Sequence, residues 1–365
     1  MSACADCLRR TALINFLSPQ VSSRLGAPGR ARALLAMSDE GLIEAVAGDR
    51  APEARRAVER FGPREARRRL AERGLHAICR HDGRYPSRLT DLEDPPAVLH
   101  SSAAPDRLEE LVSGPVVAVV GSRRASAYGL EVAREIGRSL SAAGVTVVSG
   151  LAMGIDAASH RGALEGGVRT VAVLGCGADR PYPRINAALY RRIRLAGAVV
   201  AELPPGAEPK RWTFPARNRI MAGLACATVV VEAAERSGSL ITATFAQDLG
   251  RDLGAVPGRV TSGEAAGSNA LLHAGAAVWR GGADILDAVL GAGNWHRADG
   301  SDRAAARRLE TRERCVLRAI EQGEPMRGAA SAAGLTAAEL RAALGRLELM
   351  GLVRRDGLGR YERVA

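Results

Sequence analysis

Hydrophobic residues in the middle of the chain occur as short runs, mainly of Val, Ala and Leu, that do not alternate with polar residues. Six such runs lie at 116–120, 145–149, 169–174, 197–201, 227–233 and 251–257. The stretches between them, such as 128–144, have apolar residues every three or four positions, as amphipathic helices do. Strands without alternation are buried on both faces, and strands that alternate with helices form a parallel sheet between helical layers. The pattern predicts a doubly wound, mostly parallel α/β domain over about residues 115–290.

The segments that precede this domain have a different pattern. Up to about residue 80, apolar residues recur at helical spacing in stretches interrupted by Gly and Pro, which predicts a small bundle of helices. The alternative for its basic part, 61–72, is a helix–hairpin–helix that contacts a backbone phosphate. Residues 81–114, rich in Pro and Asp, are expected to be a connector.

The C-terminal segment follows a polar stretch at 298–306, which we interpret as a linker. Two amphipathic patterns, at 311–323 and 336–351, precede a hairpin pattern with Gly at its turn, at 353–364. That order is typical of a winged helix. The predicted domains are therefore a helical domain of the SAM or helix–hairpin–helix kind at 1–80, a Rossmann-like domain at 81–295 and a winged-helix domain at 305–365.

Composition narrows the class of protein. The chain has 365 residues, of which 47% are hydrophobic and 25% charged, as in soluble globular proteins. No run approaches 18 apolar residues, so no membrane span is expected. The first ten residues lack the apolar segment of a secretory signal, and the cysteines are scattered, so a reducing, cytoplasmic location is expected.

The net charge of +11 is concentrated in the two ends of the chain. Residues 1–80 hold 15 Arg and 9 acidic residues, and residues 297–365 hold 14 Arg and 10, whereas the middle is nearly balanced. Basic flanks favour a polyanionic partner such as nucleic acid. Lys210 is the sole lysine, so part of the arginine excess reflects codon usage, and charge alone leaves the partner open.

Two cysteines, Cys4 and Cys7, form a C-x-x-C motif near the start of the chain. A zinc site needs about four ligands, and no second C-x-x-C or paired-histidine motif accompanies them. We interpret the pair as two reduced thiols near a helix start, with zinc as the alternative. The sequence leads us to expect neither a metal nor a cofactor.

Glycine marks every loop at the edge of the predicted sheet where ligands bind. In an open parallel sheet, that edge is the one at the carboxyl ends of the strands. The loops there are 121–129, 149–156, 175–183, 202–218, 235–242 and 257–269, and all contain Gly. Gly lets a backbone approach a phosphate, and the next helix offers unpaired N–H groups and the positive end of its dipole. Interspersed arginines make a phosphate-bearing ligand the favoured interpretation.

Aromatic residues gather in three of these loops although they make up only 3% of the chain. They are Tyr128, Tyr182, Trp212 and Phe214. Rings beside cations suit stacking on bases while arginines hold the phosphates. The alternative is that Trp212 and Phe214 close the domain edge as packed side chains, and we favour that alternative for Trp212 only.

Common enzyme motifs are missing from the sequence. The lysine of a Walker A loop is absent, the loop after the first parallel strand lacks the second and third Gly of a dinucleotide fingerprint, and no G-x-S-x-G occurs. Asp156 and His160, four residues apart on one predicted helix, suit a base and its orienting group. We favour a capping aspartate and a solvated histidine.

The motifs, taken together, resemble those of the DNA-processing protein A (DprA, also called Smf) family. The resemblance covers about residues 84–290 and rests on YPSRL, DPPAVL, VAVVGSRRASAYG, SGLAMGIDAASH, GCGADRPYP, ELPPG, FPARNRIMAGL, VVEAAERSGSLITA, GRDLGAVPG and GSNALLHAGA, in that order. It implies an extended Rossmann-like fold that binds single-stranded DNA, and a homodimer that protects incoming strands and loads a RecA-type recombinase in natural transformation. It implies no catalysis.

The resemblance also implies a set of DNA-binding residues. Arg123 belongs to the family's G-S-R loop, Arg184 stands where the family usually has Lys, and Phe214 is the aromatic of the FPxRN motif. Arg keeps the charge of Lys and adds a bidentate fork, so phosphate contact is expected to survive. The full set is Gly121, Ser122, Arg123, Ser149, Gly150, Arg184, Asn186, Phe214, Arg217, Asn218, Ser237, Gly238 and Ser239. In this interpretation a base covers Phe214, and the arginines around it hold the phosphates on either side.

Two alternatives remain. Nucleoside-monophosphate phosphoribohydrolases of a related fold resemble one another in a P-G-G-x-G-T-x-x-E loop, but the corresponding region here lacks Gly-Gly, and only Glu232 could serve as the acid. The winged helix could instead be the main DNA-binding part, through Arg341, Arg346, Arg354, Arg355 and Arg360. Contact with duplex DNA and contact with protein are equally open for that segment.

Overall fold

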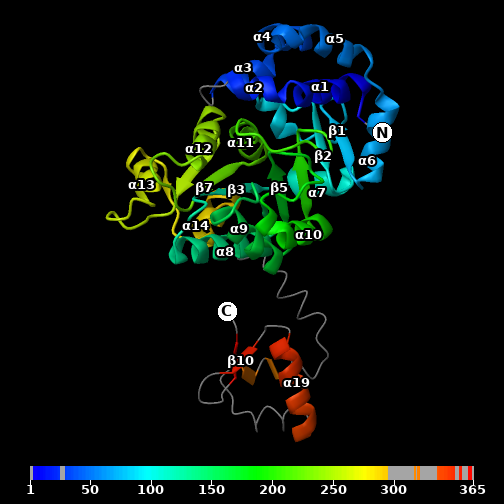
Figure 1. Ribbon diagram of the computed structural model, residues 1–365. Helices are drawn as coiled ribbons and strands as arrows, with labels where there is room; N and C mark the ends of the chain where they lie inside the picture. The colour runs from blue at the N-terminus through cyan, green and yellow to red at the C-terminus, as the bar shows by residue number, and fades with distance from the viewer. Residues whose placement is uncertain are drawn as a thin grey trace. The chain divides into compact units, whose positions relative to one another are not determined.

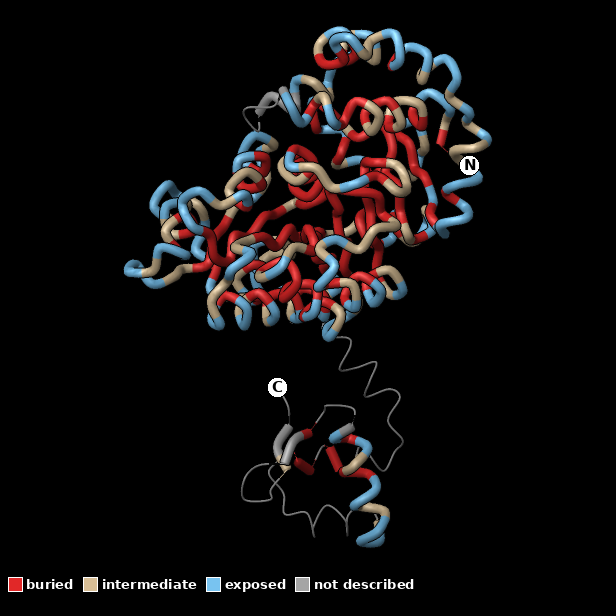
Figure 2. The backbone as a smooth tube through the Cα atoms, viewed as in Figure 1, coloured by how far each residue is buried: buried red, intermediate tan, exposed pale blue. Residues whose placement is uncertain are grey.

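The computed structural model describes residues 3–24, 29–294, 316–317, 319–320, 335–349, 353–355 and 361–363. Residues 1–295 form one compact unit and residues 296–365 another. In the first unit a sheet of nine strands lies between two layers of helices (Figure 1). The strands form the buried centre of this unit (Figure 2).

Seven strands of the sheet are parallel, and two antiparallel strands extend one edge. The order across the sheet is β1-β2-β6-β5-β4-β3-β7-β8-β9, and β1 and β2 pair antiparallel. The strands are β1 (His76–Cys79), β2 (Val98–Ser101), β3 (Val116–Val120), β4 (Thr146–Ser149), β5 (Thr170–Leu174), β6 (Ala198–Ala201), β7 (Ala227–Val230), β8 (Asp252–Ala255) and β9 (Ala277–Val278). The six strands predicted from the apolar runs are all present. From β3 the chain adds strands on one side as far as β6, then returns and adds β7 to β9 on the other.

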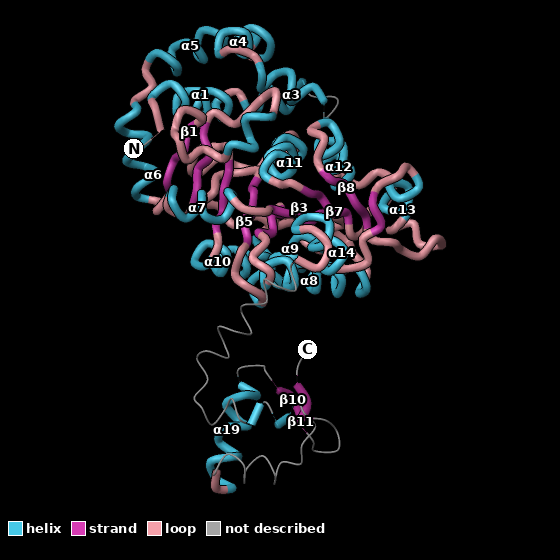
Figure 3. Tube along the Cα trace, turned by 180° about the vertical axis from the view of Figure 1, so that it is seen from behind, coloured by secondary structure: helices cyan, strands magenta, loops and turns pink. Residues whose placement is uncertain are grey.

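Alternate residues of each buried strand face opposite helical layers. Val116 and Ala118 pack with α7 (Pro105–Ser113), α11 (Thr213–Leu224) and α12 (Ser239–Asp248). Val117 and Val119 pack with α8 (Ala127–Ala142), α9 (Ile155–Glu165) and α14 (Gly282–Leu290), while α10 (Ala187–Ala196) covers β5 and β6. The view from behind shows the strands between these layers (Figure 3). Helix α13 (Ala266–His273) follows β8.

The first 80 residues are mostly helical, as predicted, but they also supply a strand. The helices are α1 (Ala5–Phe16), α2 (Ser18–Arg24), α3 (Gly29–Ala36), α4 (Asp39–Val46), α5 (Ala51–Glu59) and α6 (Pro63–Glu72). β1 follows at 76–79, before the expected boundary at residue 80, and β2 and α7 lie within 81–114, which we expected to be a connector. β1 and β2 were missed because each has only four residues and lacks a β-branched run.

Trp212 joins these N-terminal helices to the α/β part of the unit. Its side chain is buried in a cluster with Leu17, Leu42 and Ile43, and its indole N–H donates to Ser18. The favoured prediction that Trp212 packs at the domain edge is therefore confirmed. Its partners come from helices about 170 to 200 residues away, so its surroundings could not be read from neighbouring residues.

The second unit contains helix α19 (Ala337–Leu349) and an antiparallel pair of strands, β10 (Val353–Arg355) and β11 (Tyr361–Arg363). The predicted second helix and hairpin are thus present. Most of the helix predicted at 311–323, and the linker at 298–306, lie outside the described residues, so the winged helix stays a prediction. No helix in the described segments is long and apolar enough to cross a membrane.

A buried ion cluster fixes α11 against the sheet. The guanidinium of Arg219 is fully buried and donates to Asp94 at 2.7 Å and to both oxygens of Glu202 at 2.8 and 3.0 Å. Glu202 follows β6 directly, and Asp94 precedes β2. One guanidinium therefore pairs with two buried carboxylates, and removing it would be costly.

The substitution Arg219→Ala should lower the free energy of unfolding by about 3–5 kcal/mol, because both carboxylates would stay buried without their cation. Urea unfolding at constant pH measures the change. Arg280→Ala is the control, since Arg280 is exposed, lies just before α14 and pairs with Asp284 in the first turn of that helix, and it should leave the unfolding midpoint unchanged. Equal, small effects of the two substitutions would show that the cluster does not hold the fold.

Candidate nucleic-acid interface

A cavity of about 740 Å³ opens beyond the carboxyl ends of β3 and β7. β3 and β7 are neighbours in the sheet. After β3, the chain forms β4 to β6 on one side of it and then β7 to β9 on the other. The cavity walls are the loops after β3 and β7 and the first turns of α9, α11 and α12. Doubly wound sheets bind ligands at such a switch point. A second cavity of about 80 Å³ adjoins it and shares Arg123, Tyr182 and Phe214 with it.

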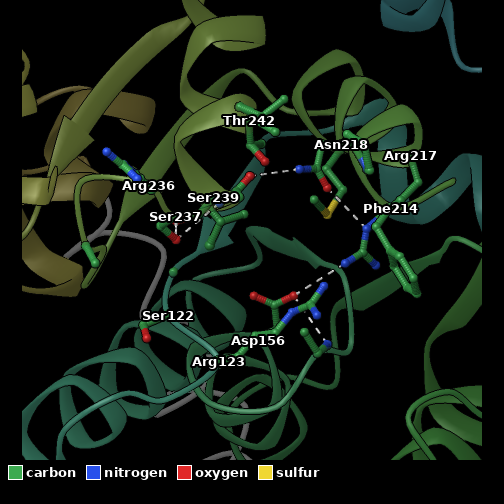
Figure 4. Close-up of a pocket in the computed structure, with 18 of the residues that line it drawn as sticks. Ser122, Arg123, Asp156, Phe214, Arg217, Asn218, Arg236, Ser237, Ser239 and Thr242 are labelled. Carbon is green, nitrogen blue, oxygen red and sulfur yellow. Dashed lines mark hydrogen bonds and ion pairs between the residues drawn. The ribbon is translucent and has the colours of Figure 1, made fainter. Parts of the chain in front are cut away.

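Positive charge dominates the lining of the large cavity. It includes one carboxylate, that of Asp156, and five guanidinium groups, those of Arg123, Arg124, Arg211, Arg217 and Arg236. Within the described part of the chain, only Arg217 among the five lies within 4 Å of a carboxylate, 3.9 Å from Asp156. The other four are exposed. Figure 4 shows Arg236 and Ser237 on one side of the cavity and Phe214 and Arg217 on the other.

Arg217 forms part of the cavity floor. It lies in the second turn of α11 and is 7% exposed, and its guanidinium donates to the carbonyl oxygens of Gly150, after β4, and Val173, in β5. A Cβ at Gly150 would lie 2.2 Å from the guanidinium, so any larger residue there would require the guanidinium to move. Burial raises the pKa of Asp156, against the opposing effect of Arg217 and of the N–H groups of Gly150 and Ala152. Arg217 therefore ties α11 to two strand ends and balances a buried acid.

The expectation that the arginines around Phe214 hold phosphates on either side is wrong for Arg219. Arg217 and Arg219 are two positions apart, so on a helix they point about 200° apart. Arg217 faces the cavity floor, and Arg219 faces Asp94 and Glu202 in the interior. Arg211, before the helix, is exposed and lines the cavity.

Phe214 is half-buried at the boundary of the two cavities. Its ring centroid lies 5.4 Å from that of Tyr182, at 35° between the ring planes, and the guanidinium of Arg123 lies 5.4 Å from it. We expected this residue in a loop, but it is the second residue of α11. Pro215 is compatible with that helix because the first N–H groups of a helix have no acceptor within it. Of the four loop aromatics, Tyr182 and Phe214 line the cavity; Trp212 is buried, and Tyr128 donates to Pro257.

Backbone contacts hold the loops after β3, β4 and β7 close together. The N–H of Ser122 donates to the Glu232 carbonyl, and its own carbonyl accepts from Ile155, the first residue of α9. Gly121 permits this approach, since a Cβ would lie 2.6 Å from Ile155 and 2.8 Å from the Glu232 carbonyl oxygen. Gly154 has a φ of +75°, and a Cβ there would lie 2.2 Å from the Ser122 oxygen. The exposed Arg123 thus projects from a closely packed backbone.

The turn of Ser237, Gly238 and Ser239 presents the start of α12 to the cavity. All three residues line it, and the two serine hydroxyl groups lie 2.7 Å apart. The side-chain amide of Asn218 donates to the Gly238 carbonyl at 3.1 Å, so α11 positions this turn. The beginnings of α11 and α12 therefore face one space. The Thr213 N–H at the first of these helices donates to the Lys210 carbonyl, and the Leu240 N–H at the second donates to the Ser237 carbonyl.

Three of the expected residues lie outside the lining of both cavities, and a fourth, Gly150, lines only the smaller one. Ser149 is buried and donates to the Val119 carbonyl, and Asn186 is buried and donates to the carbonyls of Leu151 and Ala152. Arg184 is exposed in the turn two residues after Tyr182. Ser149 and Asn186 thus support the loops of the cavity from behind. Conversely, Arg124 and Arg236 line the cavity but were not predicted as site residues, although Arg236 directly precedes the Ser-Gly-Ser turn.

The candidate acid–base groups have structural partners. Glu232 accepts from the N–H and the hydroxyl of Ser126, at the start of α8. The expectation of a solvated His160 is wrong: its ring is buried and contacts Thr170, and burial lowers its pKa to about 3. Asp156, expected to cap a helix, instead accepts from the loop after β4.

Residues 76–290 match the family described as DNA recombination-mediator protein A. The chain is 43% identical over 266 residues to a DNA processing protein DprA of Mycobacterium tuberculosis, over 71% of this chain and 67% of that relative. It is 41% identical over 205 residues to the DNA processing protein DprA of Streptococcus pneumoniae, over 56% of this chain and 71% of the relative.

Two solved structures are similar. DNA processing protein A from Streptococcus pneumoniae has a TM-score of 0.61 at 30% identity, over 78% of this chain and 98% of that one. DNA processing protein A from Helicobacter pylori, described for its single-stranded DNA binding mode, has a TM-score of 0.53 at 27% identity, over 59% of this chain and 95% of that one. Both support the expected α/β fold.

If Arg217 requires Gly150, the substitution Gly150→Ala should destabilise the protein by displacing the guanidinium. The double variant Gly150→Ala/Arg217→Ala should then lose less than the sum of the two single losses, by about 0.5–3 kcal/mol, because the new Cβ would have nothing to displace. Urea unfolding of the four proteins gives this difference. Gly114→Ala, where a Cβ would meet nothing within 4 Å, is the control. Additive effects at 150 and 217 would contradict the contact.

Proposed function

Because the chain belongs to the DNA recombination-mediator protein A family, we propose that it binds single-stranded DNA in the cavity at the β3–β7 switch point. The observation that carries this proposal is the set of exposed arginines without a carboxylate partner in the described structure, Arg123, Arg124, Arg211 and Arg236, around a half-buried aromatic ring. Arginines suit successive phosphates, and a ring suits a base.

A single strand fits this arrangement better than a duplex. A base can stack on Phe214 or Tyr182 only if its face is free, and in a duplex that face is covered by the neighbouring base pair. Recognition by stacking and by phosphate contacts also tolerates any sequence, which suits a protein that acts on strands of arbitrary origin. The similar protein from Helicobacter pylori is described for the same class of ligand.

Contact and support are divided among the residues of the cavity. The proposed phosphate contacts come from Arg123, Arg236 and the Ser237–Ser239 turn, with Ser122 next to Arg123. Phe214 is proposed to contact a base. Arg217 and Asn218 are proposed to act chiefly by holding α11 against the strand ends and the α12 turn. Four of the other expected residues are proposed to support the loops; they are Gly121, Ser149, Gly150 and Asn186. Arg184 is proposed to contact the DNA strand beyond the cavity.

The biological role is proposed from family membership. The protein would protect incoming single strands, pass them to a RecA-type recombinase as a homodimer, and act in the cytoplasm during transformation and recombination. Binding rather than catalysis is proposed because the one carboxylate in the lining, Asp156, is buried and engaged with Arg217 and backbone N–H groups. Glu232, on which the phosphoribohydrolase alternative depends, is engaged with Ser126, so that alternative is not favoured.

The substitution Phe214→Ala should weaken binding of a labelled oligo-thymidine roughly 5- to 150-fold, because one stacked base contributes about 1–3 kcal/mol. Fluorescence polarisation at constant salt measures the affinity. Tyr128→Ala is the control, since Tyr128 is an exposed aromatic in the first turn of α8 that does not line the cavity, and it should leave affinity unchanged. If the two variants bound equally well, Phe214 would have no stacking role.

The substitutions Arg123→Ala and Arg236→Ala should each reduce the slope of log affinity against log salt by about 0.7, the value for one phosphate contact on a single strand. Polarisation titrations at several salt concentrations give the slope. Arg134→Ala removes an exposed arginine of α8 that pairs with Glu165, and its slope should equal that of the unmodified protein. Unaltered slopes for Arg123 and Arg236 would show that the strand lies elsewhere.

A further inference from the structure

Four metal-binding side chains lie together at the β1 edge of the sheet. Cys4, Cys7, Cys79 and His81 each offer one ligand atom, and the four atoms lie within 4.8 Å of one another. We propose that they bind one zinc ion. In strand order, β2, β6, β5 and β4 lie between this edge and β3, so the site is separate from the proposed DNA interface.

Two short segments supply the ligands in pairs. Cys4 is the residue before α1, and Cys7 lies in the first turn of that helix, so the C-x-x-C spacing brings both thiols to one end. Cys79 ends β1, and His81 lies in the turn that follows, closed by the Asp82 N–H donating to the Cys79 carbonyl at 2.8 Å. The packing of α1 against β1 makes one cluster of the two pairs.

The distances from the imidazole to two of the thiols fit tetrahedral coordination. The Nδ1 atom of His81 lies 3.5 Å from the Sγ atoms of both Cys4 and Cys7. Zinc bonds of about 2.3 Å to sulfur and about 2.0 Å to nitrogen, at tetrahedral angles, place such atoms about 3.5 Å apart. The Cys4 N–H also points at the Cys79 Sγ, 3.5 Å away, and a donor of this kind stabilises a thiolate ligand. Cys4, Cys7 and Cys79 form no disulfide, and neither do the other cysteines in the described part of the chain.

The types of the four ligands indicate that the metal is zinc and that its role is structural. Three thiolates and an imidazole are a typical structural zinc set, whereas magnesium and calcium prefer oxygen ligands. Four protein ligands leave no open position for a substrate. Cys7 and Cys79 are buried in the same hydrophobic cluster as Leu8 and Leu75, so the ion would fasten the start of α1 to the end of β1.

This proposal replaces the expectation of two reduced thiols and no metal. The sequence contains no second motif of paired cysteines or paired histidines beside Cys4 and Cys7. Cys79 and His81 form a mixed pair with one residue between them, more than 70 residues from Cys4 and Cys7. Only the register of β1 and the position of α1 show that the pairs meet.

Metal analysis of the full-length protein, purified in the presence of a thiol reductant and without chelator, tests the proposal. We expect one zinc per chain by inductively coupled plasma mass spectrometry, released when a mercurial blocks the thiols. Protein stripped of zinc and loaded with cobalt should show the intense visible bands of tetrahedral cobalt bound to thiolates. A metal content below one tenth per chain together with no cobalt spectrum, or stoichiometric iron instead of zinc, would overturn the proposal.

Matched variants test the four ligands. Cys7→Ser and Cys79→Ser should reduce zinc affinity at least 10-fold. His81 is exposed, so His81→Ala should fold and still lose zinc, while His81→Cys, which restores four ligands, should retain it. Cys226→Ser changes a free cysteine outside the cluster and should keep one zinc per chain. Retention of full zinc by His81→Ala, or its loss in Cys226→Ser, would contradict the assignment.

Oligo-thymidine binding by the variants provides a readout of folding that does not depend on the metal. We expect His81→Ala to bind DNA within about 2-fold of the unmodified protein, since four strands separate the two sites in the order of the sheet. Its circular dichroism signal should melt at a lower temperature, because metal binding stabilises the folded state only. An unchanged melting temperature after complete loss of zinc would contradict the structural role.

Discussion

The buried guanidinium of Arg217 connects three parts of the molecule that must be in register for the cavity to exist. It donates hydrogen bonds to carbonyl groups at the ends of β4 and β5. It also faces the buried Asp156 and belongs to the helix that carries Phe214. Strand ends in a parallel sheet leave carbonyl groups that need donors, and here one side chain supplies them. Because Arg217 satisfies these groups from inside, the arginines around the rim remain available for a ligand.

Helix α11 organises the first unit because its successive side chains face different surroundings. Trp212, just before it, packs against the N-terminal helices. Phe214 and Arg217 face the cavity, and Arg219 pairs with two buried carboxylates on another side. A helix turns about 100° per residue, so eight consecutive positions can serve packing, ligand contact and charge balance at once. The abundance of arginine and aromatic residues in this segment therefore has several causes, of which DNA binding is one.

The N-terminal helices are fastened at both ends of α1. Near its carboxyl end, Leu13 and Leu17 belong to the cluster around Trp212. At its start, the proposed zinc site would join Cys4 and Cys7 to the turn after β1. Such fixed points suit a segment whose short helices bury little apolar surface of their own. They also explain how a helical segment and an α/β sheet form one compact unit.

Local pattern was enough to determine the parallel sheet, its six main strands and the edge at which glycine-rich loops gather. These features depend on residues close together in the chain, and burial on both faces leaves a direct signature in strands such as β3 and β7. The motifs in the loops were also enough to indicate the family. Tertiary structure decided which arginines face outward, since Arg217 and Arg219 look alike in sequence and differ only in what lies opposite them. It also decided that Trp212 meets Ser18 and that Cys4 and Cys7 meet Cys79 and His81. Those contacts join residues about 70 to 190 positions apart, and no periodicity along the chain records them.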